Sequence, residues 1–137
     1  MSGKVRRRLT DAARRARARW KRFLEYGFRS ESEARGLALL KGWLSPDQLA
    51  QYQAHGYFDV TGCYSRKRYR IRHGVGMNIY ELDFSGRPLI GWCFVPKDNL
   101  VAGDVMLAQK IALETNERTA LLVAKSFPPR WRPTRPV

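Results

Sequence analysis

The spacing of apolar residues in this sequence changes at Gly56, which limits the folds that the chain can adopt. Before this glycine the apolar residues recur at helical spacing, whereas after it apolar and polar residues alternate in short runs. Alternation with period two is typical of half-buried strands, and glycine-containing breaks between the runs predict tight turns. Short connections between consecutive strands predict an antiparallel meander. The predicted strands cover residues 57–60, 66–72, 77–84 and 89–95, with turns at 73–76 and 85–87.

Two capping signals before Gly56 predict a helical hairpin. Ser30–Glu33 and Ser45–Gln48 both have the pattern of a capping box, in which a serine and a Glu or Gln satisfy each other's backbone amides. The first signal predicts a helix over about residues 31–43. The second predicts a short helix that ends at Gly56, because glycine suits the left-handed conformation after a helix.

Helical patterns return after the strands. Asp104 and Asn116 are suitable N-caps for two further helices, over residues 104 to about 114 and 117–125. With 44% hydrophobic and 12% aromatic residues, the chain is too apolar to be disordered. We therefore predict an α+β domain over residues 31–127, in which short helices cover one face of a three- or four-stranded antiparallel meander.

The positive charge of the chain is concentrated in particular segments. The formal net charge is +14, and residues 1–30 hold 11 Lys and Arg against two acidic residues. Residues 63–82 hold five basic residues against one acidic residue, and residues 128–137 hold three arginines. The rest of the body is close to neutral, which divides the chain into a basic arm, a compact domain and a basic tail.

The basic arm is predicted to contain an amphipathic helix over residues 11–26, with Thr10 as its N-cap. Its apolar face is available for packing, and its other face is cationic. The apolar positions are Ala12, Ala13, Ala16, Trp20, Phe23 and Leu24, and the cationic ones are Arg14, Arg15, Arg17, Arg19, Lys21 and Arg22. Such a face can contact nucleic-acid phosphates through guanidinium groups, and the alternative is an ordinary solvated face.

A second basic pattern lies in the central strand. Alternation places Tyr69 and Ile71 toward the core and four arginines on the opposite face, which forms a cationic ladder. The ladder consists of Arg66, Arg68, Arg70 and Arg72. It either extends a phosphate track from the arm or deters pairing at a sheet edge. The tail over residues 128–137 interleaves arginines and prolines with Trp131, which suits stacking on bases, docking on a protein groove, or disorder.

The sequence offers little for catalysis. It contains no phosphate-binding loop and no nucleophile-elbow motif, and no paired carboxylates lie beside a lysine. Glu81 and Asp83 lie next to the turn at residues 85–87, where we expect them to keep the hairpin soluble. We predict no catalytic residues and no enzymatic activity.

The histidines and cysteines give no metal motif. His55, Cys63, His73 and Cys93 are separated by spacings that match no compact zinc pattern. We therefore predict no metal, no cofactor and no disulfide. Two cysteines at this spacing favour a reducing compartment, and no apolar run is long enough for a membrane span, so we expect a cytoplasmic protein that does not bind membranes.

Three segments carry a resemblance to known sequences. Residues 55–60, Tyr69–Arg72 and Gly103–Lys110 resemble a small family of uncharacterised bacterial and phage-encoded proteins. The resemblance covers about residues 44–125 and implies a domain unit that excludes the arm and the tail, but it implies no activity. The order of strands, hairpin and helix is also loosely similar to the SWIM zinc domain, although only Cys93 corresponds to the ligands of that pattern.

Together these features predict a non-catalytic protein that binds nucleic acid, DNA or RNA, through phosphate contacts of the arginine-rich arm. The predicted parts are the arm at residues 1–30, the domain at 31–127 and the tail at 128–137. The alternative is a structural or assembly subunit of a phage or host complex that docks an acidic protein partner. No recognition-helix motif predicts base-specific contacts.

Overall fold

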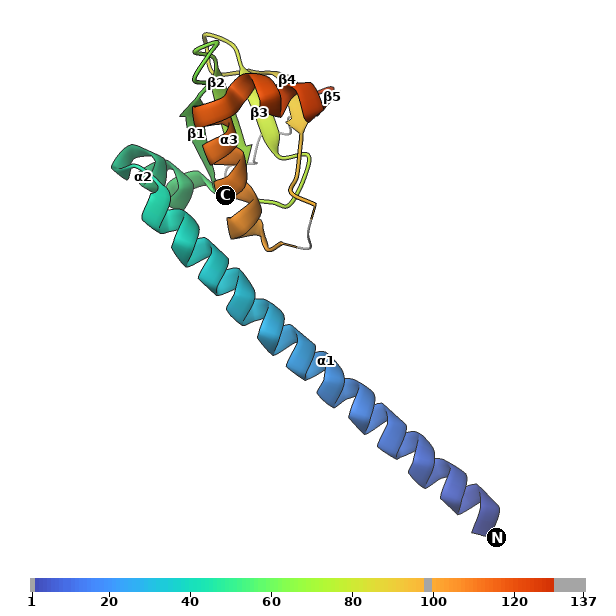
Figure 1. The fold of residues 1–137 in the computed structure, drawn as a ribbon. Helices are drawn as coiled ribbons and strands as arrows, with labels where there is room; N and C mark the ends of the chain where they lie inside the picture. The colour runs from blue at the N-terminus through green and yellow to red at the C-terminus, as the bar shows by residue number, and fades with distance from the viewer. Residues whose placement is uncertain (1, 98–99, 130–137) are drawn as a thin grey trace. The chain divides into compact units, whose positions relative to one another are not determined.

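The computed structural model describes the backbone of residues 2–97 and 100–129, with the side chains of these residues except 2–9 and 23–29. The described residues form an α+β fold of three helices and a five-stranded antiparallel sheet (Figure 1). This confirms the predicted class. The helices are α1 (Ser2–Trp43), α2 (Pro46–His55) and α3 (Ala102–Val123), and the strands are β1 (Tyr57–Thr61), β2 (Arg68–Arg72), β3 (Ile79–Leu82), β4 (Pro88–Cys93) and β5 (Lys125–Phe127).

The chain divides into two compact units, Met1–Ala34 and Arg35–Val137. The first unit holds the N-terminal part of α1, and the second holds the end of α1, the other helices and the sheet. The division predicted at residues 1–30, 31–127 and 128–137 stays a prediction. Within the predicted tail, residues 130–137, including Trp131, lie outside the described residues.

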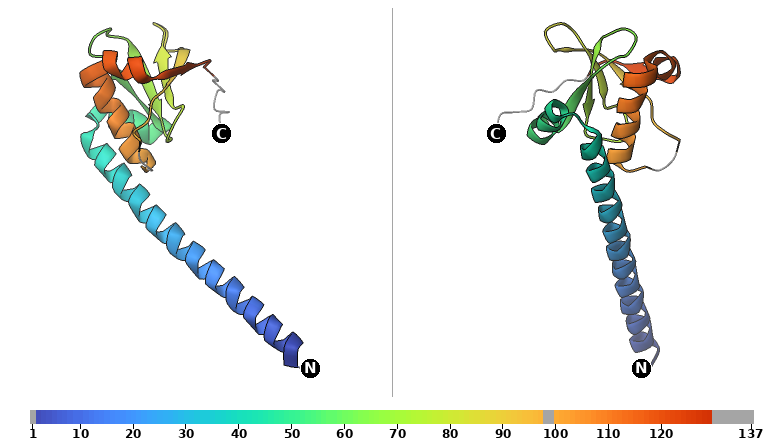
Figure 2. Two further views of the ribbon diagram at one scale, coloured as in Figure 1. Left: turned by 45° about the vertical axis from the view of Figure 1, so that its right-hand side comes forward. Right: turned by 60° about the vertical axis from the view of Figure 1, so that its left-hand side comes forward.

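The sheet is a meander in which the strands pair in chain order. Phe58 pairs with Ile71 and Ile71 with Ile79, so these side chains form a row on one face of the sheet. The helix α3 lies against this face (Figure 2) and contributes Met106 and Leu113 to the same core. Full burial of each such side chain stabilises the fold by about 1.5–3 kcal/mol.

The helix α1 corrects one expectation about the N-terminal region. A break before Ser30 was predicted, but α1 continues without interruption from Ser2 to Trp43. A single Gly27 costs a helix only about 1 kcal/mol, and no proline is present to remove a backbone donor. The capping box predicted at Ser30–Glu33 is therefore wrong, because the backbone amides there continue the helical ladder.

The start of α3 depends on two glycines. A Cβ atom added to Gly103 would lie 2.1 Å from the carbonyl carbon of Gly36, so the end of α1 crosses α3 at backbone contact distance. Gly103 lies in the first turn of this helix, which begins at Ala102 after the N-cap residue Val101. Asp104 lies in the first turn and is not the N-cap that the sequence predicted.

The helix α2 has the ends that were predicted for it. Ser45 and Gln48 form the complete capping box, and Gly56 adopts the left-handed conformation at φ 73°. The Gln48 side chain also forms two hydrogen bonds with other elements. Its Nε2 donates to the Asp59 carbonyl at 3.0 Å and to Glu114 Oε1 at 3.2 Å. One side chain thus caps α2 and ties it to β1 and α3.

The C-terminal helical region confirms one prediction and corrects another. Asn116 has non-helical dihedral angles (φ −151°, ψ 48°), so α3 is two helical segments joined at a kink, as its predicted role as a cap implied. The second segment ends at Val123, and Lys125–Phe127 then forms β5, a strand that was not predicted. Gly91 makes room for it, since an added Cβ would lie 2.1 Å from the Phe127 ring.

Candidate functional site

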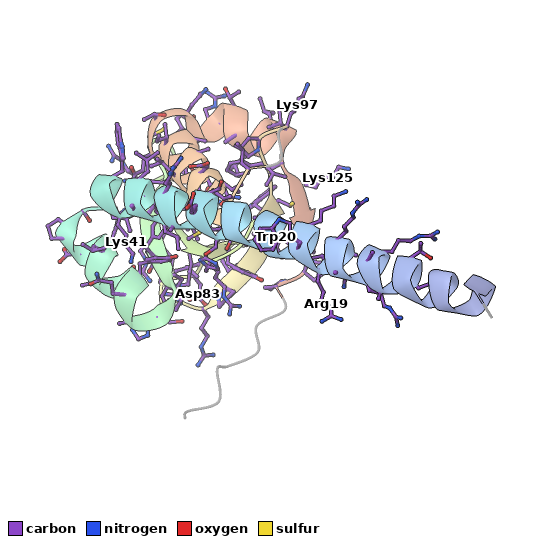
Figure 3. The ribbon with its side chains drawn as sticks, turned by 90° about the horizontal axis from the view of Figure 1, so that it is seen from below. Arg19, Trp20, Lys41, Asp83, Lys97 and Lys125 are labelled. Atoms are coloured by element: carbon purple, nitrogen blue, oxygen red, sulfur yellow. The ribbon has the colours of Figure 1, made fainter. Side chains whose placement is uncertain are left out.

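The cationic arm is exposed wherever its side chains are described. All side chains of residues 10–22 are exposed, and none of the six predicted cations pairs with a described carboxylate. Arg15 Nε donates to the carbonyl oxygen of Asp11 at 3.3 Å, and Arg19 projects from α1 (Figure 3). The six residues are Arg14, Arg15, Arg17, Arg19, Lys21 and Arg22.

The apolar positions of the same helix are also exposed over the described part. Ala12, Ala13 and Ala16 are exposed, and Trp20 is 64% exposed. The side chains of Phe23 and Leu24 lie outside the described residues. A shallow hollow on α1 is lined by Ala12, Ala16, Arg19 and Trp20.

The cationic ladder of the central strand is shorter than predicted. Arg68 and Arg72 are the ends of β2, and with Arg70 they share one face of the sheet. Arg66 precedes the strand and has a left-handed φ of 62°, which takes it out of the alternation. The predicted set of four therefore divides into three sheet residues and one loop residue.

The three sheet arginines differ in their surroundings. Arg70 is held by Asp59 through two hydrogen bonds of 2.9 and 3.1 Å, and its guanidinium lies 4.1 Å from the centroid of the Tyr57 ring. Arg72 is half-buried, whereas Arg68 is exposed. The charge of Arg70 is thus largely satisfied within the protein. Contacts of these residues with nucleic acid stay a prediction.

The most connected polar group in the described structure is Glu117, which sequence reasoning missed. It is 1% exposed and accepts hydrogen bonds from the loop before β2 and from Tyr69. The amides of Tyr64 and Ser65 donate to its Oε1 at 2.9 and 2.8 Å, and the Tyr69 hydroxyl donates to its Oε2 at 2.5 Å. The hydroxyl of Ser65 also donates to Oε2. The one sequence feature that pointed to Glu117 was its position directly after the predicted cap Asn116.

These contacts control ionisation around Glu117. Burial alone would raise the pKa of Glu117, but the hydrogen bonds from Ser65, Tyr69 and Tyr64 lower that pKa below its usual value. Burial and the hydrogen bond to Glu117 raise the pKa of Tyr69, so its hydroxyl stays a donor. The Glu117 carboxylate therefore holds the loop before β2 in place, because it accepts hydrogen bonds from four donors.

Glu81 corrects the expectation that it keeps the hairpin soluble. It is 7% exposed, and its carboxylate lies 2.9 Å from Lys67 Nζ and accepts from Trp92 Nε1 at 3.1 Å. Asp83 remains at the hairpin, where its Oδ1 accepts from Ser85 and from the Arg87 amide. The two carboxylates thus have different structural roles.

The histidines and cysteines have ordinary partners. His55 stacks on Tyr57 with ring centroids 5.2 Å apart, and the Tyr52 hydroxyl lies 2.9 Å from His73 Nδ1. Cys63 and Cys93 are free thiols. Within residues 2–97 and 100–129, no group of three or more His, Cys, Asp or Glu side chains is placed to hold a metal ion.

Comparisons with known protein families, with curated proteins and with solved structures find no match for this chain. The resemblance given above for residues 44–125 stays a prediction. None of the helices in the described part of the chain has the length and apolar content needed to cross a membrane.

Proposed function

We propose that this protein binds nucleic acid, without catalysing a reaction, through phosphate contacts of the arginine-rich segment of α1. The observation that carries the proposal is the exposed set of six cations between Arg14 and Arg22. Residues 10–22 contain one acidic residue, Asp11, so the segment lacks internal neutralisation. A cluster of this kind repels itself until an anionic partner neutralises it.

The dimensions of the segment fit a polyanion. Arg14 and Arg22 are about 12 Å apart along the helix axis at the standard rise per residue. Duplex DNA carries about seven phosphates over that length of its axis. Several cations of the helix can therefore reach phosphates at once, and guanidinium groups match phosphate oxygens in pairs.

The sheet arginines form a second, weaker part of the proposal. Arg68 is exposed and Arg66 lies in the adjoining loop, so these two can add phosphate contacts. Arg70 contributes less, because binding a phosphate would compete with its two hydrogen bonds to Asp59. Phosphate contacts carry no base information, so we expect binding to be tolerant of sequence.

A salt titration tests the proposal. If about five phosphates are engaged on duplex DNA, log K should fall against log salt with a slope of about −4.5. The double variant Arg15→Glu/Arg19→Glu should bind more weakly and with a flatter slope. A matched control is Lys97→Glu/Lys125→Glu, which changes the net charge equally at exposed positions of the other unit. This control should retain most of the wild-type slope.

The outcomes separate the alternatives. If the wild type binds neither duplex DNA, single strands nor RNA at low salt, the proposal fails and docking to an acidic protein partner takes its place. If both double variants weaken binding equally, net charge and not the arm determines affinity. If the arm variant binds as the wild type does, the phosphate site lies elsewhere, and the arginines around β2 become the next candidates.

A further inference from the structure

A hollow of about 640 Å³ lies beside the hairpin that joins β3 and β4. Its lining includes a cationic part, Arg66, Lys67 and Arg68, and an apolar part, Leu82, Phe84 and Leu89. Its volume is within the range of small-molecule binding sites. This hollow is lined by three cations and three large apolar side chains, whereas the hollow on α1 is lined by two alanines, Arg19 and Trp20.

The apolar side of the hollow presents an aromatic ring to solvent. Phe84 is fully exposed at the hairpin tip, and Leu89 is 57% exposed beside a buried Leu82. An aromatic ring of this size normally gains about 1.5–3 kcal/mol when it is buried, so full exposure sacrifices that stabilisation. Exposed apolar groups rimmed by charge are typical of binding surfaces.

The hairpin that carries Phe84 is held in one conformation. Asp83 Oδ1 accepts from the Ser85 amide, the Ser85 hydroxyl and the Arg87 amide at 2.8, 2.7 and 2.9 Å. The backbone adds bonds from Asp83 to Arg87 and from Gly86 to Asp83. The ring is therefore displayed on a rigid turn, which reduces the entropy that a ligand would have to overcome.

The cationic side is also held rigidly, through Glu117. Its carboxylate accepts from the Tyr64 and Ser65 amides directly before Arg66. The Arg66 amide donates to the Gly62 carbonyl at 3.1 Å, which helps to hold Arg66 at its positive φ of 62°. The buried carboxylate thus fixes the loop that presents Arg66 at the hollow.

The charges that line the hollow leave two cations available. Lys67 is paired with Glu81, and Asp83 is occupied by its three donors at the turn. Arg66 and Arg68 are exposed and form no ion pair with a described residue. The ligand that fits has an anionic group for these arginines and a flat apolar face for Phe84.

We propose that this hollow binds an unpaired nucleotide of single-stranded nucleic acid, with the base stacked on Phe84 and its phosphate against Arg66 and Arg68. Stacking needs a base face that is free, and the faces of paired bases within a duplex are covered by their neighbours. This inference rests on the proposed nucleic-acid binding. It predicts that the protein prefers single strands to duplexes.

Substitutions of Phe84 in the full chain test this site. Binding of oligo-thymidine, oligo-uridine and a DNA duplex is measured for the wild type and for Phe84→Ala, Phe84→Leu and Phe84→Trp. Loss of one stacked base should weaken single-strand binding by about five- to 150-fold in Phe84→Ala. Phe84→Leu should also bind weakly, since leucine has no π face, and Phe84→Trp should retain affinity. Duplex affinity should be unchanged in all three.

Leu122→Ala is the matched control, because Leu122 is another apolar residue with 84% of its surface exposed. Its single-strand affinity should equal that of the wild type. A comparison of oligo-thymidine with oligo-uridine shows whether DNA or RNA is the better ligand. The Phe84→Ala effect should also persist in the Arg15→Glu/Arg19→Glu background, because the two sites use different residues.

The results distinguish failure of this site from failure of the proposed function. If the wild type binds single strands and Phe84→Ala binds them equally well, the site is wrong and binding through the arm still stands. The proposed site is also wrong if Phe84→Ala loses affinity equally for duplexes and for single strands. If Phe84→Ala loses only binding to phosphatidylserine vesicles, while Phe84→Leu retains it, the occupant is an anionic membrane surface. If the wild type binds no nucleic acid, both proposals fail.

Discussion

At the scale of single residues, Glu117 is the group on which the local structure depends most. Its carboxylate collects donors from the loop before β2 and from the Tyr69 hydroxyl. Hydrogen bonds to a buried charged group contribute about 1.5–3 kcal/mol each, and a donor left without an acceptor costs a similar amount. A neutral side chain at this position cannot accept from all of these donors.

We predict that Glu117→Gln destabilises the protein by about 2–3 kcal/mol near neutral pH. The pKa of Glu117 is lowered in the folded protein from its ordinary value of 4.5, so the ionised group contributes stability above that pH. The contribution is lost as the pH falls through the folded-state pKa. The free energy of unfolding, measured with urea at several pH values, should therefore differ between variant and wild type at neutral pH and converge in acid.

Glu33→Gln is the control for this prediction, since Glu33 is exposed. It should change the unfolding free energy by less than about 0.5 kcal/mol over the same pH range. A Glu117→Gln protein as stable as the wild type at neutral pH would show that the loop has other sufficient support.

At the scale of elements, the contact between the end of α1 and the start of α3 is the crossing that depends on glycine. An added Cβ at Gly103 would meet the backbone of Gly36, and backbone atoms cannot rotate away as a side chain can. Gly42 lies in the same helix as Gly36, but an added Cβ there meets no atom within 4 Å. Alanine at Gly103 therefore tests the steric cost of a Cβ atom at the helix crossing, whereas alanine at Gly42 tests helix propensity alone.

We predict opposite effects for alanine at these glycines. Gly103→Ala should lower the free energy of unfolding by about 1–3 kcal/mol, because the two helices must separate. Gly42→Ala should raise it by about 0.5–1 kcal/mol, because alanine loses less conformational entropy in a helix. Thermal and urea unfolding of both variants measure this difference. Stabilisation by Gly103→Ala would mean that the helices do not approach this closely in solution.

At the scale of the whole molecule, the hydrophobic core formed by the described side chains consists of residues after the basic arm. The buried core and the apolar residues packed against it extend from Leu37 to Leu121. The compact unit that contains them begins at Arg35. The segment of α1 before this unit is therefore not needed to complete the described core.

We predict that residues 31–137 fold without the arm. Their thermal unfolding, followed by circular dichroism, should be cooperative with a Tm within about 4 °C of the full chain, which corresponds to less than about 1 kcal/mol. The same fragment should lose most of its affinity for duplex DNA. An insoluble or molten fragment would instead show that Trp20, Phe23 or Leu24 belongs to the core.

Features that depend on neighbouring residues could be predicted from the sequence. The capping box at Ser45–Gln48, the left-handed Gly56 and the kink at Asn116 follow from local backbone chemistry, and so do the turns of the meander. The concentration of charge in the arm is also a property of the sequence alone. These features were predictable because each needs only a few consecutive residues.

Features that join distant residues depend on the tertiary fold. The backbone of Gly36 meets Gly103 in the first turn of α3, where Asp104 was expected to be the cap, and Gly91 leaves room for Phe127 of the unpredicted strand β5. The tertiary fold also placed Asp59 beside Arg70, Glu117 beneath the loop of Arg66, and the hollow at Phe84. Periodicity and capping report which face of an element is apolar, but not which partner that face will meet. These contacts therefore left no local signal in the sequence.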